Sequence, residues 1–444
     1  MSKTFRDWSL DQALLLPPSV RDFVPAEHLC RFVIALVTEE LDLSAILASY
    51  QGERGQPPYH PAMMVALLLY GYAVGVYSSR RIAKACAERV DFMAIVALDA
   101  PDFRTISQFR RRHLAALSAL FLQVLRLCEQ AGLVKLGHVA LDGSKIKANA
   151  SKHKAMSYAR MTKREAELAA EVAAWLAAAE AADAAEDKAF GAAKRGDELP
   201  DWVANKQQRL AKIRAAKAAL EAEAKAKAQA EKAEREKPDG DNPRPGRKPA
   251  PPSDVPEAKA QRNFTDPESR IMKTKDGFIQ GYNAQAAVDA ASQVIVAHGL
   301  SNASNDQQQL APMLDAIEAN TGELPDEFSA DAGYCSEANL ECLDQKRVCG
   351  YVATGRQKHG AAAATGERAY RTASRLAAMA TKLRRAGRRS RYRLRKQVVE
   401  PVFGQIKQAR GFRQFLMRGI EKVTAEWAMI CTVHNLLKLA KAAA

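Results

Sequence analysis

The sequence predicts an α/β protein that carries a separate helical region at its N-terminus, and three observations support this prediction. Residues 1–132 repeat apolar side chains at helical spacing. Residues 281–353 alternate short apolar strands with helical segments, which is the order of an α/β domain. Between these parts, residues 159–236 consist mainly of Ala, Glu and Lys, which favour helix. We therefore expect a mixed sheet with flanking helices, an all-α N-terminal domain and a helical-hairpin insertion.

The composition points to a globular protein that binds a polyanion. Of its 444 residues 47% are apolar, and the formal net charge is +15 with a pI of about 9.4. Such an excess of Lys and Arg favours nucleic acid as a partner. The longest apolar run, Met63–Val76, is broken by two glycines and is shorter than the roughly 20 residues that a bilayer requires, so we expect no membrane association. No apolar segment follows the start of the chain, which predicts a cytoplasmic protein.

The seven cysteines are scattered and form no C-x-x-C motif. This spacing argues against a disulfide framework and against a structural zinc site.

Residues 1–132 are expected to form a DNA-binding or dimerisation domain. A short helix there is followed by a break at 99–101, and a second helix is expected to begin with Thr105 or Ser107 as its N-cap. A helix, a turn and a basic helix resemble the arrangement that places a helix in the major groove of DNA. An ordinary helical bundle with a solvated basic face explains the pattern equally well. The DNA-binding interpretation assigns phosphate contacts to Arg110, Arg111 and Arg112.

The middle of the chain is expected to be an insertion followed by a linker. Residues 159–236 divide at 191–202 into two strong helix formers, which predicts an antiparallel hairpin anchored by Trp175 and Trp202. Its charges alternate in sign, so most of its surface should be exposed. Residues 237–260 follow as a linker, because 237–258 contain seven prolines and no apolar periodicity.

The α/β domain is expected to comprise residues 133–158 and 261–444. A first strand should end at Asp142, and residues 281–301 should form two strands joined by a turn at 290–292. Asn305 and Asp306 should cap the helix that follows. A further strand should end at Asp331, before one more helix and one more strand.

Three acidic residues are expected at the ends of these elements. Asp142 and Asp331 each close a strand, and neighbouring strands of a sheet lie only about 4.8 Å apart. Glu400 precedes Pro401, so it lies either at the start of a helix or at a kink. Alone, each signal has a structural explanation, since Asp-Gly is also an ordinary turn. Together, hard carboxylate oxygens suit divalent ions that act on phosphodiesters.

Cationic residues accompany the third acid. Lys407 lies seven positions after Glu400, on the same helix face and about 10.5 Å away, although a solvated face would explain this pair too. The preceding stretch, 382–396, contains nine cationic residues and no acid, which favours contact with phosphates. If about six of them meet phosphates, the logarithm of the DNA affinity should fall with log salt at a slope near −5. The stretch includes Arg388, Arg389, Arg391, Tyr392, Arg395 and Lys396.

Four motifs give the chain a resemblance to a known family. They are HVALDGSKIKANAS around Asp142, DGFIQGYNAQAAVD at 276–289, SADAGY around Asp331 and VEPVFGQIK around Glu400. With them the chain resembles bacterial insertion-sequence transposases of the DDE class, in the branch with a helical N-terminal domain. The resemblance covers nearly the whole chain and implies a ribonuclease-H-like catalytic core.

The resemblance also implies an activity and a site. Asp142, Asp331 and Glu400 would be the catalytic residues and the ligands of two Mg²⁺ ions, which Mn²⁺ could replace. The enzyme would hydrolyse the transposon end to free a 3′-hydroxyl and then transfer that hydroxyl into target DNA. Its partners would be double-stranded terminal inverted repeats and target DNA, bound in the nucleoid by a homodimer.

The family signature adds phosphate contacts near the third acid. It has Tyr, two residues, Arg, three residues, Glu, six residues and Lys; here Glu400 and Lys407 keep their spacing. Tyr392 and Arg395 each lie one residue too far upstream, and in strict register Arg393 and Lys396 would take their places. The signature thus leaves open which pair contacts phosphate.

Two other functions fit the same residues. A catalytically silent DNA-binding protein would use the basic surfaces and keep the acids for structure. A stand-alone metal-dependent nuclease would cleave DNA without strand transfer. Replacing the three acids by Ala would abolish cleavage by a transposase but would not affect a silent DNA-binding protein. Joining of a free 3′-hydroxyl end to a plasmid would distinguish a transposase from a nuclease.

Overall fold

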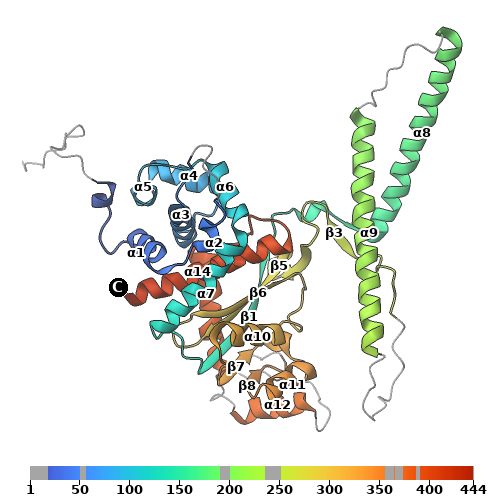
Figure 1. Cartoon of the computed structure of the whole chain (residues 1–444). Coiled ribbons are helices and arrows are strands. Elements are labelled where there is room, and N and C mark those ends of the chain that lie inside the picture. The colour runs from blue at the N-terminus through green and yellow to red at the C-terminus, as the bar shows by residue number, and fades with distance from the viewer. Residues whose placement is uncertain are drawn as a thin grey trace, which may run out of the picture.

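The computed structural model shows a body of helices and sheet from which a long helical hairpin projects (Figure 1). It describes residues 19–50, 57–190, 201–235, 252–355, 365, 374–386 and 391–443, without the side chains of 179–190, 201–204, 234–235 and 391. Most of the expected 237–260 linker lies outside these residues. The domain boundaries set out above remain predictions.

The N-terminal region is helical, as predicted. Its central helix is buried along almost its whole length, because eleven of its thirteen residues are buried apolar or small side chains. The elements are η1 (Val20–Phe23), α1 (Leu29–Ala35), η2 (Leu36–Glu40), α2 (Ser44–Leu47), the central α3 (Pro61–Ala73), α4 (Ser79–Glu88), α5 (Val90–Val96), α6 (Phe103–Arg112) and α7 (Leu114–Gln130).

The basic helix α6 begins earlier than predicted. Its N-cap is Asp102, whose carboxylate accepts a hydrogen bond of 2.8 Å from the backbone N–H of Arg104. The prediction of Thr105 or Ser107 as N-cap was therefore wrong. An Asp that directly follows Pro101 satisfies a free N–H at the helix start, which is the usual function of an N-cap.

The predicted mixed sheet is confirmed, and its strands run in the order β4-β5-β1-β7-β8, with β6 also paired to β5. The parallel pairs are β1 with β7 and β7 with β8, and the other pairs are antiparallel. The strands are β1 (His138–Lys147), β4 (Arg270–Thr274), β5 (Gly277–Asp289), β6 (Ile295–Ser301), β7 (Glu327–Ala330) and β8 (Cys349–Val352).

Two details of the sheet differ from the prediction. Strand β1 does not end at Asp142 but continues to Lys147, because the long β5 pairs with it as far as Gly281. Its last pair with β7 is Leu141 with Ala330, and the less apolar pattern beyond that point misled the prediction. Strand β4 was not predicted at all, since its residues RIMKT pair only with the far end of β5.

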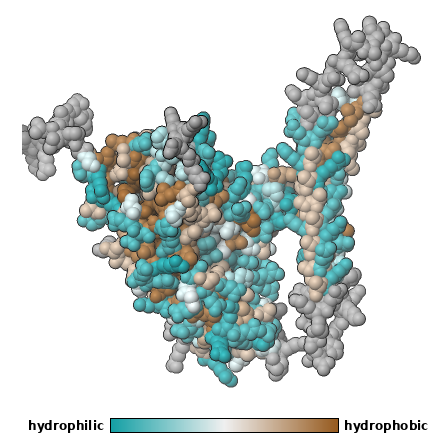
Figure 2. Space-filling view, in the orientation of Figure 1, coloured by the Kyte–Doolittle hydropathy of each residue, from teal (hydrophilic) through white to brown (hydrophobic). Residues whose placement is uncertain are grey.

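The predicted helical hairpin is confirmed as α8 (Tyr158–Phe190) and α9 (Asp201–Arg235). A small sheet of β2 (Ala155–Ser157) and β3 (Gln261–Asn263) joins its base to the body. The two helices have a core of their own, and hydrophilic residues cover much of their outer surface (Figure 2). Trp175 is half-buried, and the side chain of Trp202 lies outside the described residues. That core consists of Met161, Leu168, Leu210, Ile213, Ala216 and Leu220.

The C-terminal helices connect the sheet to the helical region. Helix α14 packs against β6, α7 and α3, and the side-chain amide of Asn435 hydrogen-bonds both N–H and C=O of Ile295 at 2.8 Å. One continuous core therefore spans the N-terminal helices and the sheet. No described helix is long and apolar enough to span a bilayer. The remaining helices are α10 (Leu310–Thr321), α11 (Glu337–Gln345), α12 (Arg375–Ala386), α13 (Leu394–Gly404), which packs on β1 and β5, and α14 (Ile420–Ala443).

Candidate active site

The sheet brings Asp142 and Asp331 together. Leu141 pairs with Ala330 in the parallel ladder of β1 and β7, so the next residue of each strand is one of the two aspartates. Asp331 follows the last residue of β7 and caps a single 3₁₀ turn, where its Oδ1 accepts a hydrogen bond of 2.8 Å from the N–H of Gly333. The register of β1 with β7 thus brings the two carboxylates side by side, although only Asp331 lies at the end of its strand.

An arginine neutralises the first of these aspartates. Asp142 Oδ2 lies 2.7 Å from Nη1 of Arg395, and Oδ1 accepts a hydrogen bond of 2.8 Å from the N–H of Gly143. Burial raises the pKa of the Asp142 carboxyl to about 6; Arg395 opposes this shift and the charge of Asp331 adds to it. Burial likewise raises the pKa of Asp331, against the N–H of Gly333 and the charge of Arg395. The carboxylates of Asp142 and Asp331 therefore repel each other, and the single charge of Arg395 does not neutralise both.

Helix α13 holds the cations at this site. Pro401 lies inside the helix and has no N–H, which frees the C=O of Gln397; that carbonyl accepts a hydrogen bond of 3.0 Å from Gln293 Nε2. The helix ends in a π turn, Gln405–Ala409, and here Lys407 Nζ donates to Ser144 Oγ at 2.5 Å and to the C=O of Lys145 at 2.9 Å. Arg395 and Lys407 thus reach β1 from the two ends of one helical segment.

Glu400 does not join the two aspartates in this structure. Its side chain is exposed and forms no hydrogen bond or ion pair with the described residues. Within the part of the chain that the structure describes, no three acidic, histidine or cysteine side chains come close enough to hold one metal ion. The structure therefore brings together two of the three predicted ligands, with Glu400 on the helix that carries Arg395 and Lys407.

The geometry favours Tyr392 and Arg395 over the pair in strict register. Arg395 is 6% exposed, and its guanidinium lies 5.8 Å from the ring centre of Tyr392, whose own pKa is raised by burial. Arg393 and Lys396 are exposed. A one-residue change of spacing before a helix is therefore absorbed locally, and the Tyr and Arg side chains lie at the carboxylates.

Asp306 is a further acid at the site that the sequence analysis missed. It was expected to cap a helix, but α10 begins only after Gln309. Instead its Oδ1 accepts hydrogen bonds from Asn283 Nδ2 at 2.6 Å and Gln285 Nε2 at 2.8 Å, and its charge helps to raise the pKa of Asp331. Two buried amide side chains within strand β5 were the signal that could have revealed it, because such groups require partners.

Two glycines make room for Asp306. A Cβ at Gly143 would lie 2.7 Å from Asp306 Oδ1, and one at Gly333 would lie 3.3 Å from Oδ2. These glycines follow Asp142 and Asp331 by one and two residues. The glycine in Asp142-Gly143 and the glycine in Asp331-x-Gly333 therefore leave space for the carboxylate of Asp306, in addition to allowing a turn.

The predicted DNA contacts outside this site have different environments. Arg110 is buried and donates to the hydroxyl of Tyr72 at 2.8 Å and to the C=O of Tyr77 at 3.2 Å, so its assignment to DNA was wrong. Arg111 and Arg112 are exposed, and Arg112 also donates to the C=O of Ser49 at 2.6 Å. The side chains of Arg388, Arg389 and Arg391 lie outside the described residues.

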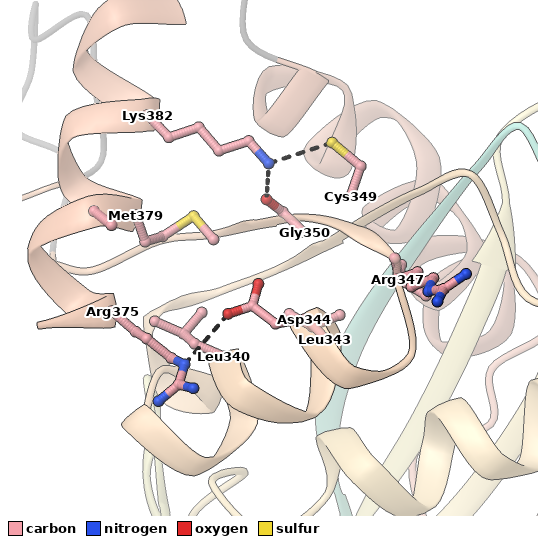
Figure 3. Close-up of a pocket in the computed structure, with 11 residues that line it drawn as sticks. Leu340, Leu343, Asp344, Arg347, Cys349, Gly350, Arg375, Met379 and Lys382 are labelled. Atoms are coloured by element: carbon pink, nitrogen blue, oxygen red, sulfur yellow. Dashed lines mark hydrogen bonds and ion pairs between the residues drawn. The ribbon is translucent and has the colours of Figure 1, made fainter.

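A separate pocket of about 410 Å³ lies between α11, β8 and α12 (Figure 3). Lys382, the first residue of the basic stretch, points into it and donates to the C=O of Gly350 at 2.8 Å. Asp344 pairs with Arg375 across the same pocket at 3.3 Å. Because its acid is already neutralised, this pocket fits a structural contact that fixes α12 on the sheet.

Comparison with known proteins now decides the family. Residues 18–112 match the family described as Transposase domain (DUF772), and residues 250–436 match the family described as Transposase DDE domain. The chain belongs to the DDE transposases of insertion sequences. Its sheet domain is ribonuclease-H-like, and the protein is a transposase enzyme that acts on DNA with a divalent metal. No curated protein and no solved structure matches the chain.

Not all of the site residues lie inside the two matched ranges. Asp331, Arg395, Glu400 and Lys407 lie inside the second range. Asp142 lies between the two ranges, so its place in the transposase site depends on the register of β1 with β7.

The two aspartates fit a hard divalent cation. Both pKa values are raised, chiefly by burial, with Asp331 adding to the shift of Asp142 and Asp306 to that of Asp331, and a bound cation would relieve both effects. Mg²⁺ is commonly held by one or two protein carboxylates and completes its shell with water and phosphate oxygens. Two oxygen donors at a partly exposed position therefore meet its requirements.

Proposed function

We propose that this transposase hydrolyses the phosphodiester at the transposon end and transfers the freed 3′-hydroxyl into target DNA, with Asp142, Asp331 and Glu400 as its catalytic carboxylates. The observation that supports this proposal most strongly is the placement of Asp142 and Asp331 on adjacent parallel strands. Their carboxylates would hold Mg²⁺, with two ions as the expected number and Mn²⁺ as a substitute. The bound ions would supply charge stabilisation to the attacking and leaving oxygens.

Glu400 is proposed as the third carboxylate once DNA occupies the site. Its helix already delivers Arg395 to Asp142 and Lys407 to Ser144, so the segment that carries Glu400 is anchored to β1 on both sides. The π turn after Gly404 and Pro401 inside the helix are features that allow a local change of helical geometry. An exposed side chain at this position can reach a phosphate-bound cation without disturbing the core.

The cationic residues would act before and during DNA binding. Arg395 keeps Asp142 ionised and occupies the carboxylate until a cation arrives. With Tyr392 and Lys407 it would then contact the phosphate next to the scissile bond. Further phosphate contacts are proposed for the exposed side chains Lys396, Arg111 and Arg112, and for Arg388, Arg389 and Arg391.

The partners follow from the same chemistry. Double-stranded terminal inverted repeats and target DNA are the proposed substrates, in the nucleoid where that DNA lies. A homodimer would hold the two transposon ends together, since two ends must be joined to one target.

The test compares single carboxylate variants. Asp142→Ala, Asp331→Ala and Glu400→Ala should each abolish cleavage of a labelled transposon end with Mg²⁺ and retain DNA binding. Glu421→Ala, an exposed acid on α14, is the matched control and should cleave normally. Cleavage by all three variants would refute the assignment and favour a DNA-binding role alone. A cut 3′-hydroxyl end that never joins a plasmid would instead indicate a nuclease.

A further inference from the structure

A groove of about 990 Å³ begins beside the proposed catalytic aspartates. Gly143 and Asp306 line one end of it, so this end adjoins Asp142 and Asp331. Its walls come from the second half of β1, the hairpin of β4 and β5, and the segment 407–414. That segment is fixed to β1, because the N–H of Phe415 donates to the C=O of Lys147 at 2.8 Å. The groove therefore has a built wall on each side.

The groove is strongly basic. Six cationic side chains line it against two carboxylates, Asp276 and Asp306. A concave surface with this excess of charge follows a phosphate backbone well. The cations are Lys145, Lys147, Lys152, Lys275, Lys407 and Arg413.

An exposed aromatic ring lies in the same groove. Phe278 is 60% exposed and is the only large exposed hydrophobic residue that lines the groove, among the residues that the structure describes. The hairpin that carries it is tight: the chain turns at 275–276, Gly277 has φ +109°, and Thr274 Oγ1 donates to the C=O of Gly277 at 2.8 Å. This tight turn thus presents the ring in the groove.

The combination identifies the form of DNA that fits. A duplex hides the faces of its bases in the stack, whereas an unpaired strand offers them to an aromatic side chain. Proteins that bind single strands combine a basic groove with such stacking rings. We propose that this groove binds an unpaired DNA strand that leads to Asp142 and Asp331, and that Phe278 stacks on one of its bases. The proposal adds the strand state of the substrate to the proposed function and rests on it.

The length of the groove agrees with this ligand. Asp142 pairs with Ala286, and Phe278 lies eight residues from Ala286 along β5. At about 3.3 Å per residue this is roughly 26 Å. A span of this length can hold an extended strand of several nucleotides, and single-strand sites cover about 4–16.

The test measures DNA binding without divalent metal, so that it does not depend on catalysis. Fluorescence anisotropy would follow a labelled oligothymidylate of about 12 nucleotides and a duplex of about 12 base pairs. Phe278→Ala should weaken binding of the single strand about tenfold and change duplex binding less than about twofold. Phe23→Ala is the matched control, because Phe23 is 61% exposed but does not line the groove, and it should change neither affinity. Unchanged single-strand binding by Phe278→Ala, or an equal loss with both probes, would overturn the proposal.

Two further variants make the result specific to stacking and to the groove. Phe278→Trp should retain single-strand affinity, and its added tryptophan fluorescence should be quenched by the oligonucleotide; no quenching would contradict stacking. The double variant Lys152→Gln, Lys275→Gln should flatten the salt slope for single-strand binding by about 1.4, and an unchanged slope would refute the groove. If these results hold and the wild type never cleaves DNA, the groove stands and the proposed function falls. If the wild type cleaves DNA but Phe278→Ala affects single-strand and duplex binding equally, the proposed function stands and the groove proposal falls.

Discussion

The ion pair between Arg395 and Asp142 determines the pH at which the site accepts a divalent cation. A carboxylate must be ionised to bind metal, so protons compete with the cation at Asp142. Arg395 lowers the pKa of Asp142 but also occupies its Oδ2 at 2.7 Å. Arg395→Gln should therefore have two opposite effects, raising the pKa of Asp142 and removing a competitor for the cation.

The magnitude follows from the pKa of about 6 for Asp142. About nine-tenths of the carboxyl is ionised at pH 7 and about one-tenth at pH 5, so the wild-type affinity for Mn²⁺ should fall about tenfold between these pH values. Loss of an adjacent arginine raises the pKa of an Asp by about 1–3 units. In Arg395→Gln the midpoint should therefore lie above pH 7, with weaker binding than wild type near pH 6 and tighter binding near pH 9.

The assay is a titration of metal-free protein with Mn²⁺, followed by calorimetry or electron paramagnetic resonance between pH 5 and pH 9. Arg111→Gln is the matched control, since Arg111 is exposed and lies on α6. The two affinity curves of wild type and Arg395→Gln should cross. Parallel curves, or a wild-type midpoint near pH 4, would show that Arg395 does not govern the ionisation of Asp142.

Three further predictions concern stability and catalysis. Gly143→Ala should lower the free energy of unfolding by about 1–3 kcal/mol in urea denaturation, because its Cβ would lie 2.5 Å from Gln285 Nε2. Gly137→Ala is the control and should lower this free energy far less, because a Cβ there would meet nothing within 4 Å. Equal losses for the two variants would contradict the packing argument. Glu400→Gln should change stability by less than about 0.5 kcal/mol, because the side chain is exposed, yet abolish end cleavage; a large loss of stability would mean that Glu400 is structural. The raised pKa of Asp142 means that metal-free protein is stabilised below pH 3.8 by this group and loses up to about 3 kcal/mol as pH rises through about 6. A fixed concentration of Mn²⁺ should therefore raise the melting temperature more at pH 8 than at pH 5, and an equal rise at both would refute the linkage.

Much of the fold could be predicted because its signals are local. Helical periodicity in the N-terminal region and the Ala-rich composition of the insertion depend on residues close in sequence, and both predictions were confirmed. The order of strands and helices after residue 281 was equally clear. Strand β4 escaped because a short strand at the edge of the sheet has few apolar residues, and its identity depends on pairing with β5.

The site was predictable only in part, because side-chain partners come from distant segments. The sequence placed both Asp142 and Asp331 at strand ends; β1 in fact continues past Asp142, and it is the register of β1 with β7 that places the two residues together. Nothing local distinguishes the buried Arg110 from the exposed Arg111, since only the fold sets Tyr72 and Tyr77 against the former. Asp306 shows the same limit: its amide partners lie more than twenty residues away.

The position of the helical hairpin has a consequence for folding. It separates β1 from β5, so the pair that carries Asp142 cannot form until residues 148–276 have been synthesised. Closing a flexible loop of that length costs about 4 kcal/mol of chain entropy. A hairpin with its own core, sealed at its base by β2 and β3, can fold first and shorten the free segment to some twenty residues, which saves about 2 kcal/mol. Early folding of the hairpin would thus bring β1 and β5 close together in the nascent chain and favour their pairing.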